Sequence, residues 1–181
     1  MVLQSKPVTT AEDFDTWIAL AENKDRHFEF INGEVVEKMA SKHRHTAVTM
    51  RICSRITIHL ETHNLPGYTT GETGGFAFGS RRYLPDCAYV DSGEPGDQIY
   101  SDIPPVLVIE VVSDPTSEQE MRHLRNKHED YLKGGATFWE VYPYDALVDI
   151  YTPDGRYRTE RDSLTFDGLP RLETPLASVF R

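Results

Sequence analysis

The apolar residues of three segments recur at the spacing of a helix. Residues 9–23 open with threonines followed by acidic residues, and residues 114–135 run from a Pro-Thr-Ser start to a Gly-Gly stop. In residues 41–63 the apolar positions fit a period of two as well as a period of four, but this segment lacks a turn signal and is too long for an ordinary strand. We therefore predict three helices, and the middle one is amphipathic, with one apolar stripe made by Val48, Ile52, Ile56 and Leu60.

Shorter segments alternate between apolar and polar residues, as strands do. The alternation around Asn32-Gly33 predicts a hairpin that pairs Phe28–Ile31 with Glu34–Lys38. We expect residues 93–105 to be a loop and the tail from 163 onwards to be a loop with a short edge element. The remaining strands are predicted as two short strands within 68–80 and single strands at 81–92, 106–112, 137–143, 146–152 and 156–162. Together these elements predict an α/β fold, with a mixed and largely antiparallel β-sheet flanked by helices.

One predicted strand contains a carboxylate that needs an explanation. The run from Val106 to Val112 is apolar and bounded by prolines, which is typical of a strand buried on both faces. Glu110 lies within it, on the same face as Val108. An isolated charge in such a place is costly, so Glu110 must be paired or must bind a metal ion.

Two further residues are candidates to meet Glu110. Asp86 follows Pro85 at the start of a predicted strand, and beside Glu110 in a sheet it would put two carboxylates within reach of one Mg²⁺ or Mn²⁺ ion. Lys127 borders the apolar stripe of the 114–135 helix and can reach the carboxylates from above the sheet. Simpler readings stay open: Glu110 paired by a core Arg or His, Asp86 as a turn residue, and Lys127 extended to water.

Charge and composition narrow the class of protein. The 181 residues suit one domain over 1–181, and a net charge of −10 argues against non-specific nucleic-acid binding. Residues 38–60 nevertheless carry five Lys or Arg residues and no acidic residue, among them Arg44, Arg51 and Arg55, so a local basic face is expected to meet solvent or a ligand. Two cysteines in unlike contexts, no membrane-length apolar run and a start without a secretory core indicate a cytoplasmic protein.

The order of these motifs resembles a known family. The chain contains "FEFINGEVVEKM" with His45, then "LPDCAYV", "VIEVVSDPT", "KHEDYLKGG" and "FWEVYP". This order is similar to that of the Uma-type restriction-endonuclease family in the PD-(D/E)XK nuclease superfamily, from about Thr9 to Tyr151. The superfamily usually carries its lysine two residues after the glutamate, where this chain has Val112, and the resemblance implies that Lys127 replaces it.

The resemblance implies a restriction-endonuclease-like fold and a Mg²⁺-dependent endonuclease that hydrolyses phosphodiester bonds in DNA, with RNA as an open alternative substrate. For a small nuclease that cuts duplex DNA, a homodimer is expected. Asp86 and Glu110 would hold Mg²⁺ (or Mn²⁺), and Lys127 would stabilise charge at the phosphate. A further carboxylate would come from Glu29, which the resemblance favours over Glu34. His45, together with the basic residues named above, would contact phosphate. Two alternatives remain: a catalytically inactive nucleic-acid-binding or protein-interaction module, in which a Glu110–Lys127 pair is purely structural, and a transition-metal site at residues 43–45, which has less weight.

Overall fold

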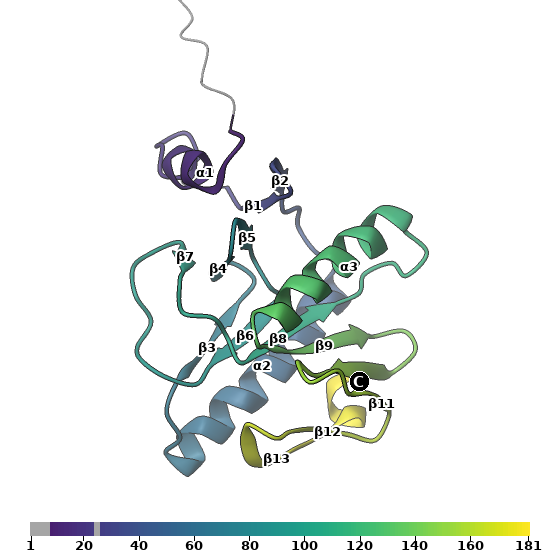
Figure 1. The fold of residues 1–181 in the computed structure, drawn as a ribbon. Helices are drawn as coiled ribbons and strands as arrows, with labels where there is room; N and C mark the ends of the chain where they lie inside the picture. Colours follow the sequence, from purple (N-terminus) through teal and green to yellow (C-terminus); the bar gives the residue numbers. More distant parts are fainter. Residues whose placement is uncertain (1–7, 24–25) are drawn as a thin grey trace, which may run out of the picture.

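A six-stranded sheet forms the centre of the computed structural model, which describes residues 8–23 and 26–181 (Figure 1). Its strands run in the order β11-β10-β9-β8-β6-β3, and β8 and β9 pair in parallel while the other neighbours pair antiparallel. The six strands are β3 (Tyr68–Gly71), β6 (Cys87–Val90), β8 (Leu107–Val111), β9 (Thr137–Tyr142), β10 (Leu147–Tyr151) and β11 (Tyr157–Glu160).

Two long helices cover the two faces of this sheet (Figure 1). The odd residues of β8, such as Ile109, pack with α2 (His43–His63), and the even residues, such as Val108, pack with α3 (Glu118–Lys133). Because side chains alternate along a strand, Glu110 belongs to the α3 face. The predicted apolar stripe of α2 is buried, with its four residues at most 5% exposed.

A second, five-stranded sheet lies on the α3 side and carries the short helix α1 (Ala11–Ile18). The predicted hairpin is present, and Asn32 and Gly33 both have positive φ (52° and 85°), as the tight turn of a two-residue hairpin requires. The strands, in the order β2-β1-β5-β4-β7, are β1 (Phe28–Ile31), β2 (Glu34–Glu37), β4 (Gly75–Phe78), β5 (Arg81–Tyr83) and β7 (Tyr100–Ser101).

The structure confirms the α/β fold with mixed sheets flanked by helices, but the strands are divided between sheets. The prediction of one strand over 81–92 is wrong, because β5 and β6 belong to different sheets and Leu84–Asp86 connect them. Pro85 has no N–H to donate to a strand ladder, and the N–H of Leu84 donates instead to Glu29 Oε1 at 2.8 Å. The predicted loop 93–105 also contains the two-residue strand β7.

The C-terminal tail is more ordered than predicted. It forms the hairpin of β12 (Ser163–Phe166) and β13 (Leu169–Pro175), followed by the helix α4 (Leu176–Val179), and both pack on the α2 face. The prediction that the basic stripe of α2 faces solvent or a ligand is wrong in part. Arg51 donates to the carbonyl oxygens of Val179 and Arg181, and the buried His59 contacts the carbonyl oxygen of Pro170.

Four sequence predictions concern the chain as a whole. Within the ranges that the structure describes, no helix combines the length and apolarity that a membrane crossing requires. Cys53 and Cys87 are buried and free. The single domain over 1–181 and the absence of a secretory signal stay predictions, since residues 1–7 and 24–25 lie outside the described ranges.

Candidate active site

Asp86 and Glu110 lie at the same edge of the central sheet. Asp86 directly precedes β6, whose first residue, Cys87, pairs with Ile109 of β8, so the antiparallel register places Asp86 level with Glu110. The N–H of Val111 donates to Asp86 Oδ2 at 2.8 Å, which fixes this carboxylate at the end of β8. Two chain segments separated by a long loop thus bring two buried carboxylates to one place.

Lys127 reaches Glu110 from α3, as the helical pattern predicts. Its Nζ lies 3.1 Å from Glu110 Oε1 and 2.8 Å from Glu29 Oε1, so one ammonium is shared between two carboxylates. Glu110 Oε1 also accepts a hydrogen bond from the Tyr131 hydroxyl at 2.7 Å. Glu29 comes from β1 in the second sheet, whereas the alternative candidate Glu34 is exposed at the hairpin turn.

Asp86 has a different set of partners. Lys38 Nζ lies 2.8 Å from Asp86 Oδ1 and donates a second hydrogen bond to the carbonyl oxygen of Leu84, also at 2.8 Å. His45, in the first turn of α2, places Nε2 3.0 Å from Asp86 Oδ2. Each of the two predicted carboxylates therefore has a lysine partner of its own.

Burial and charge act in opposite directions on these groups. Burial by itself would raise the pKa of Asp86, but the charge of Lys38 and the interaction with His45 outweigh it and hold that pKa well below its usual range. Burial raises the pKa of Glu110, and the charge of Lys127 offsets this only in part. Burial would lower the pKa of Lys127, yet the charges of Glu110 and Glu29 raise it. Asp86 is therefore ionised and Lys127 protonated at neutral pH.

These groups line a cleft of about 370 Å³, which we call the Asp86–Glu110 cleft. Its floor is the end of β8, and its walls come from the start of α3, the start of α2 and the chain after β2. The charged and titratable side chains in its lining are Glu29, Glu37, Lys38, His45, Asp86, Glu110, Glu120, His123 and Lys127.

The residues predicted to contact nucleic acid lie at different distances from this cleft. His45 lines it, and Arg44 lines a smaller depression that shares His45 and Ser113 with it. Arg44 also lies over the ring of Tyr144, 5.2 Å from its centroid. Arg55 is exposed further along α2, and the guanidinium of Arg51 already bonds to the C-terminal carbonyl groups.

Sequence reasoning did not assign Lys38, Tyr131 or Glu72 to the site. Lys38 belongs to the basic segment 38–60, and Tyr131 lies on the apolar stripe of the 114–135 helix, so the sequence pattern indicates another role for each residue. Glu72 lies in the turn between β3 and β4, 4.0 Å from His45 Nε2, and nothing in its local sequence indicates this contact.

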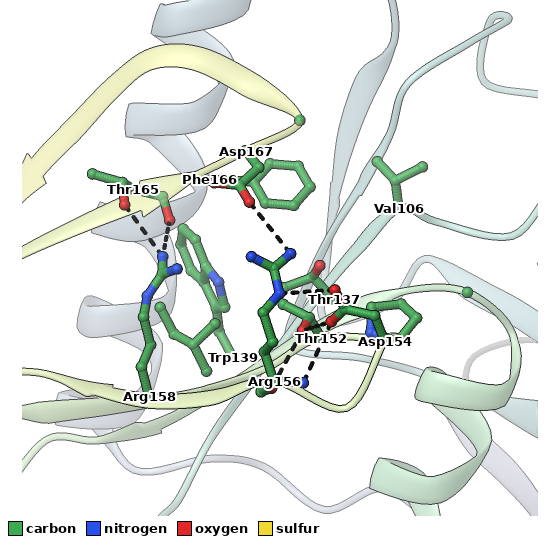
Figure 2. Close-up of a pocket in the computed structure, with 14 residues that line it drawn as sticks. Val106, Thr137, Trp139, Thr152, Asp154, Arg156, Arg158, Thr165, Phe166 and Asp167 are labelled. Carbon is green, nitrogen blue, oxygen red and sulfur yellow. Dashed lines mark hydrogen bonds and ion pairs between the residues drawn. The ribbon is translucent and has the colours of Figure 1, made fainter.

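A second cleft, of about 380 Å³, lies near the start of β9 (Figure 2). Trp139 lines it, and three of its charged groups pair with one another: Arg156 with Asp154 at 2.8 Å and with Asp167 at 3.8 Å. These side chains are more than half exposed, in contrast to the buried carboxylates of the Asp86–Glu110 cleft. The buried cluster is therefore the better candidate for chemistry.

Known proteins resemble this chain in sequence and in fold. Residues 11–179 match the model of the Uma2 family, described as "Putative restriction endonuclease". The chain belongs to the Uma2 family. A crystal structure of "a putative nuclease belonging to DUF820" from Anabaena variabilis is similar in fold, with a TM-score of 0.75 and 21% sequence identity over 94% of this chain and 97% of that chain. No curated protein matches the sequence.

Membership of the Uma2 family supports a nuclease-like function, and the structural neighbour supports the restriction-endonuclease-like fold. Lys127 lies on the helix after the Glu110 strand, while the position two residues after Glu110 is the buried Val112.

Proposed function

We propose that this Uma2-family protein is a metal-dependent endonuclease that hydrolyses phosphodiester bonds in DNA at the Asp86–Glu110 cleft. One observation carries the proposal: a buried ammonium, that of Lys127, contacts Glu110 in a cleft that also contains Asp86. Two carboxylates and a protonated amine facing one space are the groups that metal-assisted phosphodiester hydrolysis requires.

The residues of the cleft fit Mg²⁺ or Mn²⁺. Both ions bind carboxylate oxygen well. Asp86 offers an ionised carboxylate because Lys38 and His45 hold its pKa low despite its burial. Glu110 uses Oε1 for its hydrogen bonds to Lys127 and Tyr131, and within the described part of the chain no partner is assigned to Oε2. Asp86 and Glu110 are therefore the proposed ligands of the ion.

Asp86 and Glu110 would hold the ion, which would supply Lewis-acid polarisation of the scissile phosphate and a more acidic water. Lys127 remains protonated through the reaction because, although burial opposes it, the charges of Glu110 and Glu29 raise its pKa. A permanently protonated amine cannot act as a general base, so its role is to stabilise negative charge that develops on the phosphate. Glu29 holds this ammonium in position by its 2.8 Å contact.

The start of α2 offers the basic groups for the DNA backbone. Lys42 and Arg44 line the depression next to the cleft, and Arg44 is exposed, as is Arg55 further along the helix. Contacts of Arg51 with DNA would compete with its hydrogen bonds to the C-terminal carbonyl groups. We assign the phosphate contact nearest the cleft to Arg44, because His45 is buried and its two ring nitrogens face Ser113 and Asp86.

Cleavage of plasmid and single-stranded DNA with Mg²⁺ or Mn²⁺, with a matched RNA as comparison, tests the proposal. Asp86→Asn, Glu110→Gln and Lys127→Met should each lower the rate by about 100-fold or more, because each removes a group that acts on the phosphate. Glu140→Gln is the matched control: Glu140 is also buried and pairs with Glu110 in the register of β8 and β9, but it does not line the cleft. Equal activity of Glu110→Gln and Glu140→Gln would reject this site.

A second candidate function has one observation in its favour. Lys38 and Lys127 compensate Asp86 and Glu110, respectively, without any metal ion. A buried ion pair of this kind is a complete explanation of a carboxylate in an apolar strand. The alternative is thus an inactive nucleic-acid-binding or protein-interaction module, which would bind duplex DNA or a protein but show no ion-dependent cleavage.

A homodimer would allow the proposed enzyme to cut both strands of a duplex, since a two-fold axis relates the strands of DNA and the two subunits alike. Sedimentation of the protein alone and with a short duplex tests this part of the proposal. The cytoplasmic location expected from the sequence stays a prediction.

A further inference from the structure

Two residues that line the Asp86–Glu110 cleft, His45 and Asp86, meet a third possible metal ligand, Glu72, which lies outside the lining of the cleft. His45, Glu72 and Asp86 each contribute one atom, and all three atoms lie within 4.8 Å of one another. They come from three separate parts of the fold: the first turn of α2, the turn between β3 and β4, and the residue before β6. This convergence depends on tertiary packing and on no local motif.

The ring of His45 is held so that Nε2 faces these carboxylates. Its Nδ1 contacts Ser113 Oγ at 2.8 Å, which fixes the orientation of the ring. The side chain is only 8% exposed, and Nε2 has no hydrogen bond of good geometry to any described residue, although it lies 3.0 Å from Asp86 Oδ2. A buried ring nitrogen without a hydrogen bond is uncommon, and metal-binding histidines are typically oriented by a bond at the opposite nitrogen.

The separations of these atoms fit a single ion. Octahedral coordination with bonds of about 2.1 Å places neighbouring ligand atoms about 3.0 Å apart and opposite ones about 4.2 Å apart. The observed separations from His45 Nε2 are 3.0 Å to Asp86 Oδ2 and 4.0 Å to Glu72 Oε1. The separations of His45 from both carboxylates therefore fall within the range that one coordination shell requires.

We propose that the ion at Asp86 is also bound by His45 Nε2 and Glu72, and that this nitrogen ligand makes the site selective for Mn²⁺ over Mg²⁺. The inference rests on the proposed function, because it refines the metal site named there. Imidazole nitrogen is a good ligand for first-row transition ions, whereas Mg²⁺ strongly prefers oxygen. His43 makes no such contribution, since it is exposed two residues before His45.

Calorimetric titration with MnCl₂ and with MgCl₂ tests the selectivity. Wild-type protein should bind Mn²⁺ about tenfold or more tightly than Mg²⁺, and His45→Gln should lose most of this difference. Glu72→Gln should weaken the binding of both ions, because it removes an oxygen ligand. His43→Gln, on the same helix turn, is the matched control and should leave both affinities unchanged.

Electron spin-echo envelope modulation of bound Mn²⁺ detects nitrogen ligands of the ion and does not depend on enzymatic activity. Modulation from a coordinated ¹⁴N nucleus should be present in wild type and in His43→Gln and absent in His45→Gln. Circular dichroism and thermal unfolding check that the variants fold. Glu72 is the safer second variant, since its side chain is 31% exposed in a turn. Unchanged Mn²⁺ binding in both His45→Gln and Glu72→Gln, or wild-type Mn²⁺ without nitrogen coupling, overturns the inference.

The outcomes separate this inference from the proposed function. Nitrogen-coupled Mn²⁺ binding without DNA cleavage would support the inference and reject the nuclease. Ion-dependent cleavage at Glu110 with ion affinities insensitive to His45 and Glu72 would support the nuclease and reject the inference. If neither ion binds to the wild-type protein, both fail.

Discussion

Lys127 is the residue on which the charge balance of the cleft depends. Its ammonium lies between Glu29 and Glu110, and the three side chains are at most 9% exposed. Water can therefore compensate none of these charges well. Loss of one partner from such a group leaves a buried charge uncompensated, which costs more than the intact interaction contributes.

Replacement of Lys127 by methionine should lower the free energy of unfolding by about 3–5 kcal/mol, as measured by urea denaturation at pH 7. Lys133→Met is the matched control, because Lys133 pairs with Glu129 on the same helix but both side chains are more than 70% exposed, so its cost should stay below about 1 kcal/mol. Further replacement of Glu29 and Glu110 by glutamine should recover part of the loss. Similar costs for both lysine variants would contradict the buried network.

His128 should make the stability depend on pH. Burial against Phe138 and Tyr151 lowers its pKa, and the charge of the adjacent Glu129 offsets this only in part. The unfolded chain therefore binds a proton at a higher pH than the folded one, so the free energy of unfolding falls as the pH drops below about 6.5.

The measurement compares urea denaturation of wild type and His128→Gln between pH about 7.5 and about 5. The variant should lose less stability than wild type on acidification. His45 also contributes to the pH dependence, with the opposite sign, because Asp86 raises its pKa against the effect of burial. Since both proteins contain His45, its contribution cancels when the wild type is compared with the variant. Parallel pH profiles would contradict the prediction.

At the scale of elements, α2 connects the cleft to the rest of the fold. Its first turn brings His45 to Asp86, its apolar stripe packs on the central sheet, and Arg51 bonds to the end of the chain. A helix with this many roles must be held rigidly by its buried face.

Ile52→Ala on the buried face should cost about 2–5 kcal/mol, because Ile52 is 1% exposed and the deletion leaves a cavity. Ile58→Ala on the same helix should change the stability by less than about 0.5 kcal/mol, since Ile58 is 56% exposed. Thermal or urea unfolding measures both. Equal effects would show that the helix is oriented differently on the sheet.

At the scale of the whole molecule, the net charge of −10 opposes binding to DNA, so the local basic groups must supply the attraction. Arg44 lies beside the cleft with its guanidinium over the ring of Tyr144, whereas Arg171 is exposed on the β13 hairpin and lines neither cleft. The two arginines differ in position but carry the same charge.

Removal of Arg44 should reduce the slope of log affinity for duplex DNA against log salt concentration by about 0.9, the value for one phosphate contact. Fluorescence anisotropy in the Glu110→Gln background, without divalent ions, measures this slope without cleavage. Arg171→Ala should leave the slope unchanged. A slope that responds to Arg171 and not to Arg44 would place the DNA on another surface.

Local patterns predicted the elements well and their assembly less well. The helices, the Asn32-Gly33 hairpin and the strand of Glu110 follow from backbone periods and turn chemistry, which act within a few residues. The division of 81–92 between two sheets was missed, although Pro85 lies at the break. The ordered C-terminal hairpin was missed because its stability comes from packing on α2.

The sequence alone determined that Glu110 needs a partner, because burying an unpaired carboxylate in an apolar strand is costly anywhere in a protein. Only the tertiary structure decided which partners meet: Lys127 with both Glu29 and Glu110, and Lys38 and His45 with Asp86. These partners lie 17 to 98 positions apart in the chain, and the packing of helices on two sheets sets the distances between them. A local pattern carries no information about such distances.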